Sequence, residues 1–193
     1  MHALNGILVR PARPSDWQGV AYVHEQSWGS SLSPLLPPGV LEYLAQGRRH
    51  QDIAALLQHP GQHQHMLVAE CSRTVAGFVW FGAEPHELPP YQAQIHSLHV
   101  APEFQRARIG TCLLRAAVRE LCRTGIASLM LWVLKENRPA RSFYERCGGV
   151  LLPIERPFVF RGVRYPSYRL LAYGWDGLPG QCLGPVSGDQ GTR

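Results

Sequence analysis

The segment Ser128–Lys135 constrains the fold most, because it is nearly all apolar over the length of one strand. A strand of this kind is buried on both faces, so helices must cover both sides of its sheet. An amphipathic helix is predicted before it, over Gly110–Arg123, and a helix capped by Asn137, with Pro139 in its first turn, is predicted after it. The segment therefore predicts an α/β fold with a mixed sheet between helical layers.

The rest of the chain completes this layered fold. Further strands are predicted over Leu4–Arg10, His65–Cys71, Val75–Ala83, Gln92–Val100, Val150–Pro153 and Tyr165–Gly174. Ser15 is the predicted N-cap of a first helix, whose apolar face runs from Trp17 to Trp28. A second helical region spans about Val40–Leu57, where a glycine at position 47 could divide it.

The domain limits follow from composition. Ser30–Gly39 is rich in serine and proline and is predicted to be a loop. From position 176 the chain is rich in glycine and proline and has no periodicity, so we predict a disordered tail over 176–193. One domain is expected over residues 1–175, with a central, strongly twisted sheet of about seven strands.

Positive charge is concentrated in one part of the chain. The net charge is +5, and every basic residue except Lys135 is an arginine. Five arginines fall in one short stretch, at Arg106, Arg108, Arg115, Arg119 and Arg123. A local cluster favours a ligand that carries phosphate, whereas a nucleic-acid-binding module would need a broad basic face with interleaved aromatic residues. We therefore expect no nucleic-acid partner.

Cysteine spacing and hydropathy exclude other classes. The five cysteines include no Cys-x-x-Cys pair, which argues against a disulfide framework and a zinc knuckle. Three loop histidines, His59, His63 and His65, lack a companion carboxylate, so we expect them to be solvated and no metal to be bound. The longest apolar run, Ile126–Leu134, is too short to cross a bilayer, and no secretory signal is evident. These features predict a cytoplasmic protein without a membrane partner.

The passage from Leu98 to Thr111 carries the sharpest chemical signal. A strand runs through a loop into a helix, and the first turn of a helix has unpaired N–H groups and a dipole that favour phosphate. Arg106 and Arg108 add charge, and Thr111 adds a hydroxyl donor. The alternative is an ordinary strand-to-helix turn with arginines that face solvent, and the spacing alone leaves both interpretations open.

This passage resembles the Gln/Arg-x-x-Gly-x-Gly/Ala signature of the GCN5-related N-acetyltransferases, the GNAT superfamily. Gln105 and Gly110 match the signature, whereas Arg108 stands where the family has its first glycine. A Cβ there obstructs the approach of a pyrophosphate, but an arginine in ordinary helical conformation would still offer its N–H. The resemblance implies that acetyl-CoA contacts Leu98, His99, Val100, Gln105, Arg106, Ala107, Arg108, Ile109, Gly110, Thr111, Asn137 and Tyr144.

A second segment, Asn137–Gly149, is similar to the family's Asn-x-x-Ala-x-x-Phe-Tyr-x-x-x-Gly pattern at every defined position. In the family the asparagine contacts the cofactor, and the tyrosine hydroxyl protonates the departing thiolate. The resemblance therefore implies that Asn137 binds the cofactor and that Tyr144 is the general acid. Taken alone, Asn137 could equally be a helix cap and Tyr144 a core aromatic residue.

The chemistry of such a transfer has further requirements. Aminolysis of a thioester needs a neutral amine, a held carbonyl group and a proton donor for the sulfur. The backbone N–H groups of Leu98 and Val100 could bind pantetheine as an added strand and polarise the acetyl oxygen. Gln94 stands where many relatives have a glutamate that helps to deprotonate the amine, and an amide cannot act as a base. His96 is a candidate substitute, the alternative being a buried strand histidine.

Other residues carry weaker signals. Glu84, His86 and Glu87 precede the predicted cofactor strand and either attract a cationic amine or form a polar turn. Four aromatic residues could wall an acceptor pocket or pack beneath the last hairpin, and we favour packing for Phe158, Phe160, Tyr165 and Tyr168.

The predicted function is an acetyl-CoA-dependent N-acetyltransferase that moves an acetyl group to a primary amine by direct attack in a ternary complex. The expected partners are acetyl-CoA and a small amine or peptide acceptor, and the chain could form a homodimer. A non-catalytic acyl-CoA-binding sensor or scaffold is the alternative, supported by Arg108 and Gln94. A basic nucleic-acid-binding module is the third hypothesis.

Overall fold

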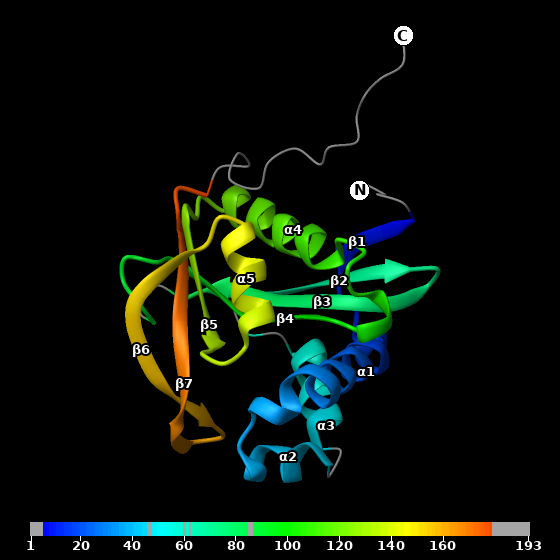
Figure 1. Cartoon of the computed structure of the whole chain (residues 1–193). Helices are drawn as coiled ribbons and strands as arrows, with labels where there is room; N and C mark the ends of the chain where they lie inside the picture. Colours follow the sequence, from blue (N-terminus) through cyan, green and yellow to red (C-terminus); the bar gives the residue numbers. More distant parts are fainter. Residues whose placement is uncertain (1–5, 46–47, 60, 62, 85–86, 179–193) are drawn as a thin grey trace.

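The computed structural model describes residues 6–45, 48–59, 61, 63–84 and 87–178. One seven-stranded sheet has the order β1-β2-β3-β4-β5-β7-β6, and its described neighbours are antiparallel except β4 and β5. The strands are β1 (Ile7–Pro11), β2 (Gln64–Cys71), β3 (Thr74–Ala83), β4 (Ala93–Val100), β5 (Ser128–Leu134), β6 (Val150–Phe160) and β7 (Val163–Asp176). The sheet is strongly twisted, since β2 and β3 run across Figure 1 while β7 runs nearly vertically.

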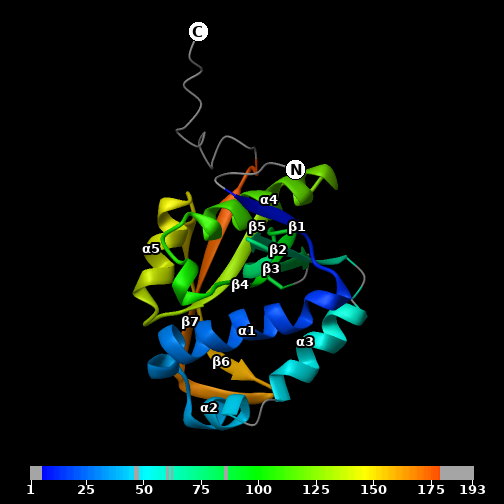
Figure 2. The ribbon, with the colours of Figure 1, turned by 90° about the vertical axis from the view of Figure 1, so that its right-hand side faces the viewer.

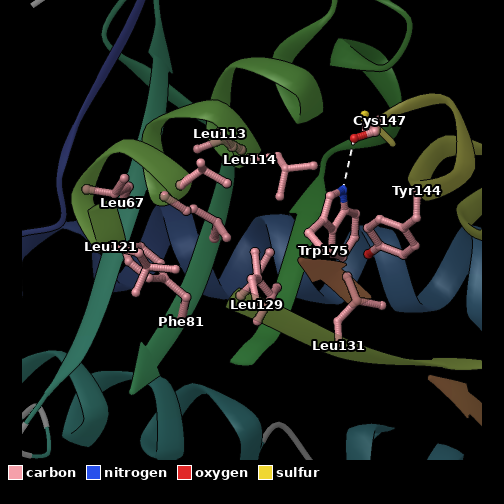
Figure 3. Packing of buried hydrophobic residues seen from close by; sticks show 14 of the residues in the cluster. Leu67, Phe81, Leu113, Leu114, Leu121, Leu129, Leu131, Tyr144, Cys147 and Trp175 are labelled. Carbon is pink, nitrogen blue, oxygen red and sulfur yellow. Dashed lines mark hydrogen bonds between the residues drawn. The ribbon is translucent and has the colours of Figure 1, made fainter. Parts of the chain in front are cut away.

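Helices cover both faces of this sheet, as predicted (Figures 1 and 2). They are α1 (Trp17–Ser27), α2 (Pro38–Ala45), α3 (Arg48–Gln58), α4 (Ile109–Arg123) and α5 (Arg138–Arg146). The buried stripe of α4 packs on one face against side chains of β3 and β5, as Figure 3 shows for Leu113, Phe81 and Leu129. On the other face, Val20 of α1 and Ile53 of α3 pack against Phe78.

The first helix begins differently from the prediction. Ser15 is not its N-cap, because Pro14–Asp16 form a 3₁₀ turn and α1 starts at Trp17 without a side-chain cap. The carboxylate of Asp16 instead accepts a hydrogen bond from the backbone N–H of Arg13 at 2.7 Å and pairs with the Arg10 guanidinium at 2.7 Å. The helical region therefore begins at Pro14, one 3₁₀ turn before α1, and the Arg10–Asp16 ion pair links this turn to β1.

The segment predicted as a loop over Ser30–Gly39 is largely helical. Trp28–Leu32 form one π-helical turn, Ser33–Leu35 form a 3₁₀ turn, and α2 already begins at Pro38. The second helical region is indeed two helices, and the residues between α2 and α3 lie outside the described part of the chain.

The last two strands are longer than predicted. The strand predicted over Val150–Pro153 continues as β6 to Phe160; it is an edge strand, and edge strands and bulges tolerate its prolines at 153 and 157. Its register with β7 shifts between Leu151 and Glu155 and again between Pro157 and Phe158. The ordered chain also passes position 175, because Leu178 is buried and its N–H donates to the carbonyl of Ala127 at 2.7 Å.

Candidate active site

A break in the pairing of β4 with β5 creates the site. The two parallel strands pair only from Ala93 to Ile95, opposite Leu129 to Leu131. Trp80 lies opposite Ser97 while Phe81 lies opposite Ile95, so His96 is the extra residue of a β-bulge. Because a bulge bends its strand and interrupts pairing, the ends of β4 and β5 separate beyond it. A cavity of about 1040 Å³ lies there, lined by both strand ends.

The free edge of β4 faces this cavity. The N–H of Ala101 donates to the carbonyl of Ala76 on β3 at 3.0 Å. Backbone groups of successive residues in a strand point to opposite sides, so the N–H groups of Leu98 and Val100 point away from β3. The side-chain amide of Gln105 donates to the carbonyl of Val100 at 3.3 Å, in agreement with this direction. The two predicted backbone donors thus lie at the edge that lines the cavity.

The side chain of His99 turns toward α1. Its Nδ1 lies 3.0 Å from the hydroxyl of Ser27, and its Nε2 accepts a hydrogen bond from the indole N–H of Trp28 at 3.4 Å. Ser27, Trp28 and His99 all line the cavity, so this network joins α1 to β4 at the wall of the site.

The loop between β4 and α4 has an unusual backbone. Arg106 and Arg108 have φ values of 63° and 62°, in the left-handed region. The expectation that Arg108 is in ordinary helical conformation is therefore wrong: it keeps the conformation that a glycine would adopt at this point. Left-handed residues that alternate with ordinary ones turn successive N–H groups toward one concave side, an arrangement that binds anions.

The N-terminus of α4 has unsatisfied donors. No side chain caps the helix at Arg108, and the first amide with a described intrahelical bond is that of Cys112, which donates to the Arg108 carbonyl at 3.0 Å. The N–H groups of Ile109, Gly110 and Thr111 come before Cys112. They belong to the first turn, where backbone N–H groups have no intrahelical acceptor. A Cβ on Gly110 would lie 3.3 Å from the ring of Phe143, so glycine allows α4 to approach α5 closely.

The predicted cofactor residues mostly meet at this cavity. Ala107 and Ile109 do not line it, because the side chain of Ile109 is buried in the core and Ala107 is exposed. The arginine cluster divides: Arg106, Arg108 and Arg115 line the cavity, but Arg119 and Arg123 do not. The sequence analysis missed Arg146, which lies on α5 and lines the cavity too.

Helix α5 brings Asn137 and Tyr144 to the cavity. Asn137 caps the helix, since its side-chain oxygen accepts from the N–H of Ala140 at 3.2 Å, and it also lines the cavity. Tyr144 is 8% exposed, and its ring centroid lies 6.3 Å from that of Tyr173. Its ring also stands edge-on to Trp175, with centroids 6.2 Å apart; Figure 3 shows these two side chains next to each other. Burial raises the pKa of Tyr144 well above its usual range, so the phenol stays protonated at physiological pH.

His96 and Gln94 lie at the point where the strands part. The His96 side chain is 17% exposed, and its ring centroid lies 4.7 Å from that of Trp80. The amide nitrogen of Gln94 lies 3.3 Å from Nδ1 of His96. Burial lowers the pKa of His96, and the negative charges of Glu84 and Glu87 offset part of this effect. The imidazole is therefore neutral near pH 7, the state that a base requires.

The other end of the cavity has mixed walls. Leu32 and Leu36 come from the segment between α1 and α2, whereas Trp132, Arg156 and Phe158 come from β5 and β6. Phe158 packs against Phe160 and Tyr165, as predicted, and it lines the cavity as well. The three other aromatic residues also pack, with ring-centroid distances of 5.3 Å for Tyr43–Phe160, 6.1 Å for Phe158–Tyr165 and 6.4 Å for Tyr165–Tyr168. Sequence signals for this wall are weak because its residues are far apart in the chain.

Two glutamates contact residues that line the cavity. The carboxylate of Glu87 accepts a hydrogen bond from the indole N–H of Trp132 at 3.0 Å and forms an ion pair with Arg156. The Arg156 guanidinium lies 4.1 Å from the centroid of the Trp132 ring. Glu84 lies beside His96, and His86 is outside the described residues.

The described residues were also compared with the requirements of a metal site and of a membrane-spanning helix. Within the described residues, no three His, Cys, Asp or Glu side chains form a group that could hold a metal ion. No helix in that part of the chain is long and apolar enough to cross a membrane.

Comparisons with known proteins give a consistent result. The sequence model of the Acetyltransferase (GNAT) family matches residues 31–149. A Mycobacterium tuberculosis protein named as a probable N-acetyltransferase is 31% identical over 144 residues, which cover 74% of this chain and 79% of that protein. A Bacillus subtilis protein named as an uncharacterized N-acetyltransferase is 25% identical over 172 residues, which cover 89% of this chain and 94% of that protein.

Solved structures share the fold. The PaiA N-acetyltransferase from Thermoplasma acidophilum, crystallised with coenzyme A, superposes with a TM-score of 0.65 at 18% identity. The superposition covers 88% of this chain and 99% of that one. Because the family model matches more than half of the sequence and the fold agrees, the chain belongs to the GNAT family of acetyltransferases and is an N-acetyltransferase.

Proposed function

We propose that the protein transfers the acetyl group of acetyl-CoA to a primary amine by direct attack of the amine in a ternary complex. The composition of one cavity carries this proposal. It combines the anion-binding loop and α4 N-terminus, the free edge of β4, a protonated buried tyrosine and a neutral histidine. The acceptor is a small amine or the amino group of a peptide.

The residues around the α4 N-terminus fit the phosphate groups of coenzyme A. The uncapped first turn supplies backbone N–H donors, and Arg106, Arg108 and Arg115 supply positive charge. On this proposal the cofactor is held by Leu98, His99, Val100, Gln105, Arg106, Ala107, Arg108, Ile109, Gly110, Thr111, Asn137 and Tyr144. Ala107 and Ile109 contribute backbone groups alone, because their side chains do not line the cavity.

Each step of the transfer is assigned to a group of this chain. Leu98 and Val100 N–H groups pair with pantetheine as an added strand would and stabilise negative charge on the acetyl oxygen. His96 takes the proton that the amine nitrogen releases as it bonds to the carbonyl carbon. Tyr144 gives its hydroxyl proton to the sulfur as the C–S bond breaks and regains a proton from solvent. The products are the acetylated amine and a free thiol.

The proposal also includes the compartment, the oligomeric state and the limits of the catalytic domain. Cys71, Cys112, Cys122 and Cys147 are free thiols, in keeping with a reducing cytoplasm. The edge strand β6 exposes Val150, Leu151 and Val159, which is compatible with a homodimer. We propose residues 1–175 as the catalytic domain, extended by the packed end of the chain up to Leu178.

A panel of primary amines tests the function. The assay measures thiol release from acetyl-CoA with small amines, amino acids and peptides bearing a free N-terminus or a lysine. We expect one acceptor class with a kcat/KM at least about tenfold above the others. The control is His96→Gln, which removes the proposed base but can still donate hydrogen bonds. Release that does not depend on any amine, at equal rates in both proteins, would refute an amine acetyltransferase.

A further inference from the structure

The surroundings of His96 contain buried polar atoms without partners. Within the described residues, buried side-chain atoms that lack a hydrogen bond include His96 Nε2, Trp80 Nε1 and Gln64 Oε1. Gln64 and Gly82 are register partners, as are Gly82 and Gln94, so Gln64 and Gln94 lie on one face of the sheet. Buried polar atoms are normally hydrogen-bonded, so the unpaired Nε2 of His96 calls for an explanation.

A carboxylate lies in the middle of this group. Glu84 Oε1 is 3.7 Å from His96 Nε2 and accepts a hydrogen bond from the Gln64 amide nitrogen at 3.0 Å. A Cβ on Gly82 would lie 2.7 Å from that amide nitrogen, so the glycine leaves the room in which Gln64 reaches Glu84. The side chain of Glu84 is 39% exposed, which connects the buried histidine with solvent.

The contacts of the ring favour one of its two neutral tautomers. The Gln94 amide nitrogen can only donate, so Nδ1, which faces it at 3.3 Å, holds the lone pair. The proton of the neutral ring is then on Nε2, which faces Glu84. Gln94 and His96 both line the cavity, and the long contact between them is one that an amine or a water can replace.

We propose that Glu84 is the positioning residue of the base: it holds His96 in the Nε2–H tautomer and stabilises the imidazolium that forms when Nδ1 takes the amine proton. This inference rests on the proposed function. In this step an N–H bond of the amine breaks and an Nδ1–H bond forms; the proton later leaves Nδ1 for solvent through the cavity, while the Nε2–H group stays directed at Glu84. The aligned carboxylate acts as it does in a Ser-His-Asp triad.

The other charges near His96 are few and partly compensated. Glu87 also raises the pKa of His96, but its carboxylate is ion-paired with Arg156 of β6. From β2 and β3, the neutral side chains of Gln64 and Trp80 face this region, and from β4 the neutral Gln94 does so. Glu84 is therefore the charge whose removal should change the ring most.

The first test needs no ligand. Nitrogen NMR of the full chain reads the tautomer and pKa of His96, and the spectrum of His96→Gln identifies its signals. We expect the Nε2–H tautomer in the parent. Glu84→Gln should lower the pKa of His96 by about one unit, the usual effect of losing one opposite charge at this distance. The matched control Glu87→Gln should lower it by less than about half of that, and Glu84→Asp, which keeps the charge, should lower it least.

The second test asks whether the pairing serves the reaction. The pH profile of kcat/KM is measured with acetyl-CoA and the best amine of the panel. In Glu84→Gln the acid limb should move to lower pH by the same one unit, and the plateau should fall about threefold to tenfold because the base is weaker. An Nδ1–H tautomer, or a pKa that Glu84→Gln leaves unchanged, overturns the inference. If the pKa falls but the acid limb stays, the pair exists and the base role of His96 in the proposed function fails.

Discussion

Replacing Arg108 with glycine separates the backbone of the anion-binding loop from the arginine's charge. Arg108 has φ 62° and ψ 9°, a left-handed conformation that costs an L-residue about 1–2 kcal/mol. Glycine adopts it without that cost, but the more flexible unfolded chain offsets about 0.5–1 kcal/mol of the gain. Arg108→Gly should therefore stabilise the protein by roughly 0–1.5 kcal/mol, which raises Tm by up to about 6 °C for a chain of this size.

Thermal unfolding with and without acetyl-CoA measures both consequences. Arg108→Ala is the matched control, because it removes the same guanidinium but keeps the Cβ and its strain, so it should not gain stability. Both variants should lose only a few-fold in acetyl-CoA affinity if the backbone N–H groups hold the phosphates. A drop in Tm for Arg108→Gly would refute the strain argument. A loss of more than about 100-fold in affinity in both variants would mean that the guanidinium itself binds phosphate.

Three other outcomes are expected. Tyr144→Phe keeps the buried ring, so calorimetry should find acetyl-CoA binding nearly unchanged while kcat falls about 10²-fold or more; an equal rate across the pH range would make Tyr144 a core residue only. Acetyl-CoA should raise Tm by mass action, and dephospho-CoA should raise it less if an arginine binds the 3′-phosphate; no shift at millimolar acetyl-CoA would contradict the cofactor. Because the pKa of His96 is lowered by burial, its stabilising contribution is present above its unfolded pKa near 6.5 and is lost as pH falls. His96→Gln should therefore flatten the acid side of the stability profile in urea titrations, and an unchanged slope would argue that His96 titrates as it does in water.

The parts of the site that depend on short segments could be predicted from the sequence. The passage from Leu98 to Thr111 and the segment Asn137–Gly149 each form one strand-to-helix or helix-cap unit, so spacing alone brings their donors together. The fold class followed from the buried strand at Ser128–Lys135, since its burial requires cover on both faces. Arg108 escaped prediction because its left-handed conformation is imposed by the loop and contradicts the residue's own preference.

The acceptor end could not be predicted, for a different reason. Leu32 and Leu36 meet Arg156 and Phe158 across more than a hundred positions of chain, and no local period links them. The strand β6 continues past the predicted end at Pro153 to Phe160, because its edge position and bulges accommodate its prolines. The partnership of Glu84 with His96 likewise depends on the register of three strands.

The bulge in β4 makes the site depend on the length of the chain at one position as well as on side chains. His96 is inserted between two residues whose partners on β3 are adjacent. Deleting it would leave every other pair of β3 and β4 in place, but it would remove the bend that parts β4 from β5. A chain shorter by this single residue would keep its strand partners and its core, and it would lose the cavity in which we propose that the substrates meet.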